Sequence, residues 1–375
     1  MTTPEVPPRY SPLHEAHLAA GASFTDFAGW QMPVRYSSDL AEHHAVRTAA
    51  GLFDLSHMAE FRVEGAEAGA FLDEAFAGRL SAIEPGQAKY SLLLAESGGI
   101  VDDVVVYRTG EEQFLVVANA SNREPVAVAL EERVAGFDTA LVDVSDETAL
   151  VAVQGPNARA VLERASGLTV EGLDGLRYYR AVPATFDGVP VLLARTGYTG
   201  EDGFELYLAP DAAPALWDAL RAAGEGLDLV PAGLASRDTL RLEAGMPLYG
   251  HELGLDTLPA QAGLGRVPVM AKTSFVGRAA LEAGVPEGAR VLVGLVGEGR
   301  RAARAGYEVY ADAESTVPVG VITSGALSPT LGHPIAMAAV DPALAEPGTE
   351  LSADIRGSRL AYRTTPLPFY RRTKD

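Results

Sequence analysis

Hydrophobic and polar positions recur with a helical period in some segments of the chain and with a strand period in others. Amphipathic stretches predict helices at residues 37–51, 121–136, 155–167, 211–224 and 235–245. In the first of these, Asp39 and Glu42 are spaced as a capping pair, and Gly51 is the expected C-terminal stop. Helices interspersed with strand-like runs predict an α+β fold.

The sequence pattern changes from about Val291, where short segments rich in strand-forming residues are separated by Gly, Pro and Asp. Only one short helix, at residues 277–284, comes just before this region. Many short strands with frequent turn residues are typical of small closed β structures. We therefore expect a C-terminal β-barrel, jelly-roll-like domain appended to the α+β part.

Two adjacent carboxylates, Asp102 and Asp103, stand in an apolar, β-branched run that follows the turn glycines Gly98 and Gly99. Neighbouring side chains on a strand point to opposite faces, so at most one of these aspartates can face a given cavity. The alternative is a polar strand entrance with both carboxylates solvated or capping the turn, since most acidic residues lie on surfaces.

Composition narrows the classes of function. The 375 residues suggest two or three domains, and the net charge of -20 (30 Lys+Arg against 50 Asp+Glu) disfavours a nucleic-acid partner. The absence of cysteine excludes disulfides, thiolate metal sites and a cysteine nucleophile. The first 17 residues lack the features of a signal peptide, and no apolar run is long enough to span a membrane. These observations predict a cytoplasmic protein that binds no membrane.

Histidine-based sites are disfavoured. His43 and His44 are sequential on a predicted helix and diverge too far to share a metal ion, so we expect no metal. The segment FDLSHM contains Asp54, Ser56 and His57, but a nucleophile needs a base that converges from elsewhere in the fold. No phosphate-binding glycine motif is present.

The segment ARTGYTGEDGFELY, residues 194–207, has three glycines that suit a tight hairpin loop, and a hairpin alone would explain them. Glycine also permits close approach of a flat ligand, and this loop carries Tyr198 and Glu205 on either side of the turn. An aromatic face beside a carboxylate can bind a heterocycle with a guanidine-like edge, such as a pterin.

Several motifs together resemble aminomethyltransferase, the T-protein of the glycine cleavage system. They are DFAGWQMPVRY, GLFDLSHM, KYSLLL, GGIVDDVVVYR, VVANASN, VQGPNA, RTGYTGEDGFELY, GLASRDTLRLEAGMPLYGHEL and PFYRR. The resemblance runs from about Pro12 to Arg372 and implies three domains arranged as a cloverleaf around a central folate channel. It implies a split domain 1 (1–55 and 145–230), a domain 2 (56–144 and 231–285) that shares the folate-binding core with domain 1, and a C-terminal β-barrel domain (286–375).

The same resemblance implies the site residues. The family's catalytic aspartate corresponds to Asp103, which leaves Asp102 facing away as a structural or capping group. Folate-contacting positions correspond to Met58, Tyr90, Asp103, Tyr107, Asn119, Tyr179, Tyr198, Glu205, Arg237 and Arg371. Tyr107 lies four residues beyond Asp103, the even spacing that one strand face requires. Where the family usually has Trp, this chain has Arg266, which either meets the acidic folate tail or is simply exposed to solvent.

The implied reaction belongs to glycine catabolism and one-carbon metabolism. An aminomethyl group carried on the lipoyl arm of H-protein passes to tetrahydrofolate, ammonia leaves, and 5,10-methylenetetrahydrofolate forms. Asp103 would stabilise the cationic N5-iminium or act as a general base. The rival is a folate-binding accessory protein of iron–sulfur cluster maturation, but that group carries a cysteine motif where this chain reads KTSFVGRAAL.

Overall fold

The computed structural model describes residues 7–373, which form two compact units. Unit 1 comprises the residues up to 68, 82–89 and 105–238, and unit 2 comprises 69–81, 90–104 and the residues from 239 onward. Residues 1–6 and 374–375 lie outside the described part. The prediction of no signal peptide falls partly on the first group, and the predicted barrel domain includes the second. The split of the chain into three domains stays a prediction.

The largest sheet of unit 1 has the strand order β11-β12-β13-β14-β10-β4-β15 and is antiparallel except between β4 and β15. Its strands are β4 (Ala50–Asp54), β10 (Ala149–Gln154), β11 (Leu168–Val170), β12 (Ala181–Phe186), β13 (Val189–Ala194), β14 (Gly203–Leu208) and β15 (Leu229–Pro231). The register places Glu205 of β14 between Ala152 of β10 and Ala194 of β13. Two small neighbours leave room around the Glu205 side chain for other groups to approach it.

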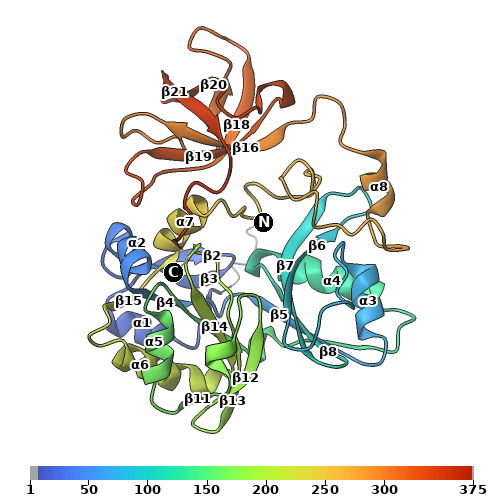
Figure 1. Cartoon of the computed structure of the whole chain (residues 1–375), viewed down its shortest axis with the longest axis vertical. Helices are drawn as coiled ribbons and strands as arrows, with labels where there is room; N and C mark the ends of the chain where they lie inside the picture. The colour runs from blue at the N-terminus through green and yellow to red at the C-terminus, as the bar shows by residue number, and fades with distance from the viewer. Residues whose placement is uncertain (1–6, 374–375) are drawn as a thin grey trace. The chain divides into compact units, whose positions relative to one another are not determined.

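Two helices predicted from the sequence pack against this sheet, α5 (Ala158–Arg164) and α6 (Ala213–Ala223) (Figure 1). Their apolar faces join the sheet's Val and Leu residues in one core, in which Trp217 is fully buried. Truncation of such a residue to alanine costs about 3–5 kcal/mol of stability. This core makes the sheet that carries Glu205 a rigid platform.

A second sheet has the order β6-β7-β8-β5-β9. Its strands are β5 (Ala59–Glu64), β6 (Ala88–Leu94), β7 (Ile100–Gly110), β8 (Gln113–Ala118) and β9 (Ala140–Asp143). The run around Asp103 is therefore a strand, β7, as the sequence predicts. Helix α4 (Arg123–Arg133) confirms another predicted helix and buries Val126 and Leu130. Helix α3 (Ala68–Ala75) follows β5 in the chain.

The amino-terminal part of unit 1 contains a small sheet of order β1-β3-β2. The strands and helices of this part are β1 (Arg9–Tyr10), α1 (His14–Ala19), β2 (Ser23–Phe27), β3 (Trp30–Arg35) and α2 (Asp39–Thr48). Behind it lies a buried polar chain in which the Tyr36 hydroxyl bonds His17 Nδ1 at 2.9 Å, and His17 Nε2 bonds Asp54 at 2.8 Å. These hydrogen bonds tie α1 to β4 and to Tyr36, the residue that follows β3.

The predicted ends of the helix at 37–51 are wrong. Its N-cap is Ser38, whose hydroxyl accepts the backbone N–H of Ala41 at 3.0 Å, because serine precedes the first helical turn and is a strong capping residue. Glu42 does not pair with Asp39; its carboxylate accepts backbone N–H groups from Tyr36, Ser37 and Gly233 instead. Gly51 does not stop the helix, since it lies in β4.

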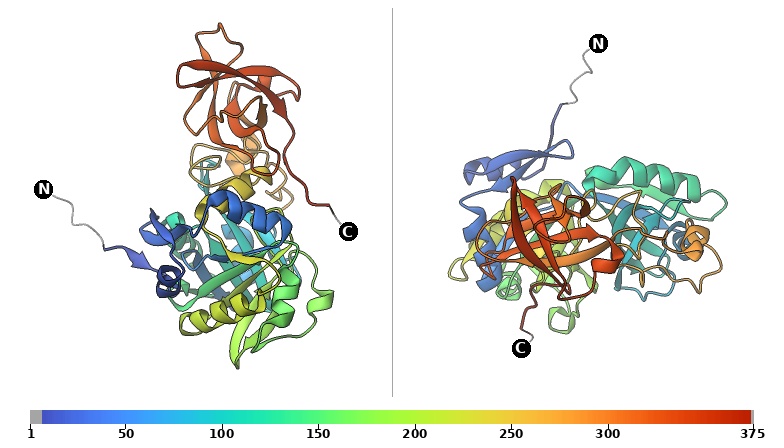
Figure 2. Two further views of the ribbon diagram at one scale, coloured as in Figure 1. Left: turned by 90° about the vertical axis from the view of Figure 1, so that its left-hand side faces the viewer. Right: turned by 90° about the horizontal axis from the view of Figure 1, so that it is seen from above.

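The C-terminal part of unit 2 is a closed barrel of order β16-β19-β18-β17-β20-β21, drawn in orange and red in Figure 1 and seen from two further sides in Figure 2. Its strands are β16 (Val291–Gly297), β17 (Glu308–Tyr310), β18 (Pro318–Leu327), β19 (Pro334–Val340), β20 (Glu350–Ile355) and β21 (Ser358–Thr365). Closure removes exposed strand edges, and a core of Val, Leu, Ile and Ala fills the interior. The predicted α+β fold with a C-terminal β-barrel is confirmed.

The remaining helices are α7 (Leu234–Glu243) and α8 (Arg278–Ala283), both expected from the sequence. Short 3₁₀ turns lie at Ala120–Asn122, Ser145–Glu147, Leu173–Gly175, Pro210–Ala212 and Pro342–Leu344. The last turn of α7 is fixed by buried Arg241, which bonds Glu252 at 3.0 Å and Ser324 at 2.7 Å. Between residues 7 and 373, no helix is long and apolar enough to cross a membrane.

Candidate active site

Strand β7 places the two aspartates on opposite faces. Burial alternates from Ile100 to Val106, with Asp102 among the fully buried positions and Asp103 among the half-buried ones. Tyr90 donates its hydroxyl hydrogen to Asp103 Oδ2 at 3.0 Å. The alternation inferred from the sequence is present, and the alternative in which both carboxylates are solvated is wrong, because Asp102 has no exposed surface.

The glycines before β7 serve the turn and a close backbone contact. Gly98 has a φ of 82°, which favours glycine, and a Cβ atom on Gly99 would lie 1.7 Å from the carbonyl oxygen of Leu255. Tyr249 also lies near the aspartates, since burial and then the charges of Asp102 and Asp103 raise the pKa of its phenol. In unit 2, the Asp103 carboxylate thus accepts a hydrogen bond from Tyr90 and acts electrostatically on Tyr249.

In unit 1, three hydroxyl groups converge on one oxygen of Glu205. Oε2 accepts hydrogen bonds from Thr196 Oγ1 and from Tyr107 Oη at 3.2 Å, and Tyr207 Oη lies 3.4 Å away. Tyr207 also donates to Tyr107 Oη at 3.2 Å. Oε1 receives no hydrogen bond from any residue that the structure describes. The arrangement fixes the carboxylate and leaves one oxygen for a ligand N–H group.

The electrostatics of this cluster keep its hydroxyl groups protonated. Burial, followed by the Glu205 charge, raises the pKa values of Tyr107 and Tyr207 well above 10. Protonated phenols are hydrogen-bond donors toward the Glu205 carboxylate. The carboxylate can therefore act as an anionic acceptor toward a cationic or N–H-rich edge.

A buried framework holds the loop that carries Tyr198. Gln154 donates its side-chain N–H to Thr196 O at 3.0 Å and accepts the Thr199 hydroxyl at 2.9 Å. A Cβ atom on Gly197 or Gly203 would lie within 2.0 or 2.4 Å of the Gln154 side chain. These two glycines make room for Gln154, while their role in the approach of a ligand stays a prediction.

Arg237 lies over the ring of Tyr198, with its guanidinium carbon 4.9 Å from the ring centroid. Burial lowers the pKa of Arg237, and the negative charge of Glu205 opposes that effect. The sensitivity of Arg237 to Glu205 indicates that the two side chains belong to the same part of unit 1. The structure therefore brings together the predicted residues Tyr107, Tyr198, Glu205 and Arg237.

The other predicted residues lie around or away from this group. Tyr179 adopts a left-handed backbone conformation with φ of 60°, and its phenol contributes to the raised pKa of Tyr107. Met58 and Asn119 are half-buried in unit 1. In unit 2, Arg371 is exposed, and so is Arg266, which matches the solvent-exposed alternative for that arginine.

Sequence reasoning missed Thr196, Tyr207 and Glu60, and rejected His57 only as a triad member. His57 is buried beside Met58, its Nδ1 has no partner among the described residues, and burial lowers its pKa to about 4. Thr196 and Tyr207 occur inside the RTGYTGEDGFELY motif, so their proximity to Glu205 was the available signal. Glu60 gave no such signal.

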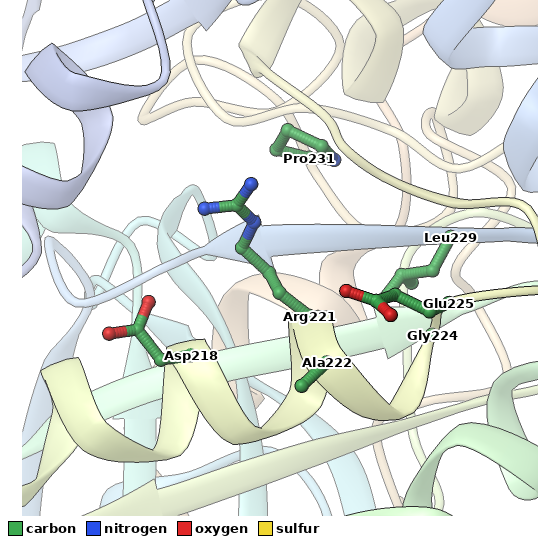
Figure 3. Close-up of a pocket in the computed structure, with 7 residues that line it drawn as sticks. All are labelled: Asp218, Arg221, Ala222, Gly224, Glu225, Leu229 and Pro231. Carbon is green, nitrogen blue, oxygen red and sulfur yellow. The ribbon is translucent and has the colours of Figure 1, made fainter.

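A surface hollow of about 400 Å³ lies at the C-terminal end of α6 and contains none of the predicted site residues (Figure 3). It is lined by Asp218, Arg221, Ala222, Gly224, Glu225, Leu229 and Pro231. Two carboxylates and one guanidinium give it mixed charge. Among residues 7–373, no group of three or more His, Cys, Asp or Glu side chains could hold a metal ion.

Comparison with protein families and with curated proteins identifies the chain's relatives. The family model described as GCVT N-terminal domain matches residues 13–272, and that of the glycine cleavage T-protein C-terminal barrel domain matches residues 290–371. The chain is 58% identical over 371 residues to aminomethyltransferase of Cutibacterium acnes, covering 97% of this chain and 99% of that protein. The chain belongs to the aminomethyltransferase family of glycine cleavage T-proteins.

Other aminomethyltransferases agree with this membership. That of Streptomyces coelicolor is 55% identical over 372 residues and covers 98% of both chains. The crystal structure of glycine cleavage system aminomethyltransferase T from Bartonella henselae matches with a TM-score of 0.89 at 38% identity, covering 98% of this chain and 99% of that one. The chain is thus an aminomethyltransferase, a transferase of the glycine cleavage system, as the sequence motifs predict.

Proposed function

We propose that this aminomethyltransferase accepts an aminomethyl group from the lipoyl arm of H-protein and transfers its carbon to tetrahydrofolate. Ammonia, the reduced lipoyl arm and 5,10-methylenetetrahydrofolate are the products. Tetrahydrofolate, as co-substrate, supplies the two nitrogen atoms that capture the one-carbon unit. No metal takes part in the proposed reaction.

The observation that carries this proposal is the hydroxyl-ringed carboxylate of Glu205 beside the Tyr198–Arg237 stack. With Oε2 occupied by hydroxyl groups, Oε1 is available to an N–H donor, which is what the guanidine-like edge of a pterin presents. Tyr198 offers a flat face to a ring, and Arg237 offers positive charge. The residues present therefore fit a reduced pterin better than an aliphatic or phosphorylated ligand.

Asp103 is the proposed catalytic residue. It lies on the half-buried face of β7, where Tyr90 donates a hydrogen bond to Oδ2. A carboxylate about 4 Å from a unit positive charge contributes on the order of 4 kcal/mol at an effective dielectric constant near 20. The same carboxylate can accept a proton from a nitrogen atom that becomes bonded to carbon. The sequence motifs assign both Asp103 and Glu205 to folate contacts, and Asp103 and Tyr107 have the even spacing that one strand face requires.

Met58, Asn119, Tyr179 and Arg371 complete the proposed folate contacts. Tyr179 is supported by its effect on Tyr107, whereas the other three rest on the sequence motifs alone. The lipoylated H-protein is the proposed protein partner, and a cytoplasmic location stays a prediction from the sequence.

The test is tetrahydrofolate-dependent release of ammonia from aminomethyl-loaded H-protein. We expect ammonia and 5,10-methylenetetrahydrofolate to appear in equal amounts, with no stimulation by divalent metal. Ammonia released at the same rate without folate would refute the proposed acceptor. Folate binding without transfer from loaded H-protein would instead refute the proposed donor.

A further inference from the structure

Helix α2 of unit 1 carries two buried charged side chains that the proposed mechanism does not use. Glu42 is 1% exposed and Arg47 is 8% exposed. Charged side chains are almost never fully buried unless they are paired. The partners of these two side chains therefore indicate which parts of unit 1 the helix holds in place.

Arg47 binds the loop between β13 and β14 that carries Tyr198. Its Nη1 donates to the backbone oxygen of Thr199 at 2.7 Å and to Glu201 Oε1 at 2.9 Å. The side chains of Arg47 and Glu201 are each 4% exposed, so solvent ions screen their attraction little. Thr199 directly follows Tyr198 in the chain. The backbone at Tyr198 therefore cannot move away from α2 without breaking a buried hydrogen bond.

Glu42 binds the start of the helix that carries Arg237. Its Oε2 accepts the backbone N–H of Gly233 at 2.9 Å, and the oxygen of Gly233 accepts the N–H of Arg237 at 3.1 Å, inside the first turn of α7. A Cβ atom on Gly233 would lie 2.4 Å from the backbone of Val34, so this point of the chain is also packed closely against β3. Helix α2 is thus bonded to the beginning of α7 as well as to the Tyr198 loop.

We propose that Arg47 is a positioning residue for Tyr198, and that it holds the Tyr198 ring at the place where Arg237 stacks on it. The two members of this stack come from separate segments, and α2 is bonded to both of them. The guanidinium carbon of Arg237 lies 4.9 Å from the centroid of the Tyr198 ring, and a contact of this kind is lost beyond about 6 Å. A fixed link between the segments keeps the ring and the cation together before a ligand arrives.

This inference rests on the proposed function, since Tyr198 and Arg237 are the groups proposed to receive the pterin. A site that is already ordered loses less conformational freedom when its ligand binds, and this preserves affinity. Arg47 acts here through the loop and not on the transferred carbon. Its loss should therefore raise KM for folate more than it lowers kcat.

The first experiment needs no folate. Amide hydrogen exchange of residues 196–203 is compared in wild type, Arg47→Met and Tyr36→Phe. Tyr36→Phe is the control, because it removes a hydrogen bond of unit 1, that to His17 Nδ1 at 2.9 Å, which does not involve the loop. We expect exchange of this segment to become about tenfold faster in Arg47→Met and to stay at the wild-type rate in Tyr36→Phe. Wild-type exchange in Arg47→Met would overturn the proposal.

The second experiment measures tetrahydrofolate affinity by calorimetry. Arg47→Met should bind folate about tenfold more weakly than wild type, the size of the cost of ordering a loop and one aromatic side chain on binding. Arg47→Lys should recover part of this loss, because Nη1 alone makes both hydrogen bonds and an ammonium group has enough donors for the two. Tyr36→Phe should keep the wild-type affinity. Equal affinity of Arg47→Met and wild type would refute the positioning role.

A double variant separates positioning from stability. Arg47→Met alone leaves the Glu201 carboxylate buried and without its cation, whereas replacement of both partners by apolar groups is often neutral for folding. Arg47→Met/Glu201→Met should therefore recover the urea midpoint that Arg47→Met loses, or fold where the single variant does not, and still bind folate weakly with fast exchange in the loop. Recovery of affinity together with stability would mean that Arg47 serves folding only. If wild type itself binds no folate, the proposed function fails, while the exchange experiment still decides whether Arg47 holds the loop.

Discussion

Replacement of each aspartate of β7 in turn separates charge at the site from support of the strand. Asp103→Asn keeps the size of the side chain and retains an oxygen that can accept the Tyr90 hydroxyl, now 3.0 Å from Oδ2. It removes the negative charge. Asp102→Asn makes the same chemical change one residue away, on the fully buried face of the strand. The two variants are therefore matched controls for each other.

The magnitude follows from the surroundings of Asp103. At about 4 Å from a unit positive charge, a carboxylate contributes about 1 kcal/mol in bulk water and about 4 kcal/mol at an effective dielectric constant near 20. Asp103 is half-buried and bonded to Tyr90, so its environment lies toward the second value. Each tenfold change in rate corresponds to about 1.36 kcal/mol, so we expect kcat to fall about 100-fold to 1,000-fold.

The assay is ammonia release from loaded H-protein, together with urea unfolding of each variant. Asp103→Asn should unfold near the wild-type midpoint and keep folate affinity within about threefold, because shape and the Tyr90 contact are retained. Asp102→Asn should lose at least about 1 kcal/mol of stability, because a fully buried polar group is altered, and should keep most of its turnover. If Asp102→Asn loses turnover and Asp103→Asn loses mainly stability, the face assignment is wrong.

Three further predictions test other parts of the molecule. Tetrahydrofolate should raise Tm without divalent metal, since a ligand at 100 times its Kd stabilises the native state by about 2.7 kcal/mol, and Glu205→Gln should weaken this shift; an undiminished shift would remove Glu205 from the site. The barrel segment GEGRRAARAGYE carries three exposed arginines that should contact H-protein, Arg300, Arg301 and Arg304. Joint replacement of the three by Ser should raise KM for loaded H-protein and reduce the salt dependence of this KM, but leave the folate-induced Tm shift unchanged. Unchanged kinetics with H-protein would place docking elsewhere. Burial lowers the pKa of His57 from 6.5 to about 4, so the unfolded chain takes up the proton first as pH falls. The free energy of unfolding should therefore drop by about 3 kcal/mol between pH 6.5 and pH 4. Acid unfolding curves of His57→Asn should lack this loss.

Much of the fold follows from periodicity. The helices around Trp217 and Val126, strand β7 and the change to β structure near Val291 were predictable because each buries one apolar stripe or run. The ends of α2 were not, because Ser38, Asp39 and Glu42 are all plausible caps and the choice depends on a distant backbone N–H, that of Gly233. Element cores are local properties, whereas element ends are decided by tertiary contacts.

Candidate site residues were likewise predictable where the signal is local and not predictable where it depends on tertiary contacts. Asp102 and Asp103 stood out because carboxylates within an apolar run are unusual, and strand alternation placed them on opposite faces. The family resemblance, and not the alternation, selected Asp103. Glu60 has an equally unusual environment, but the sequence shows only an acid on a strand that also carries Arg62 and Glu64, both of which have substantial exposure. Its burial is a tertiary property, which no local pattern encodes. Buried acids of this kind are recognised only in the folded structure.

Gln154 provides a structural reason for two glycines of the loop that the sequence interpretation did not include. The sequence places glycines where a neighbour comes close but does not say which neighbour, and at Gly197 and Gly203 it is the amide of Gln154. That amide holds Thr196 O at 3.0 Å, and the Thr196 hydroxyl in turn donates to Glu205 Oε2. The orientation of the proposed ligand carboxylate therefore depends on a neutral, fully buried glutamine that need not touch the ligand. Substitutions at Gln154 should then be expected to alter folate binding through Thr196, even though the charge of the site is unchanged.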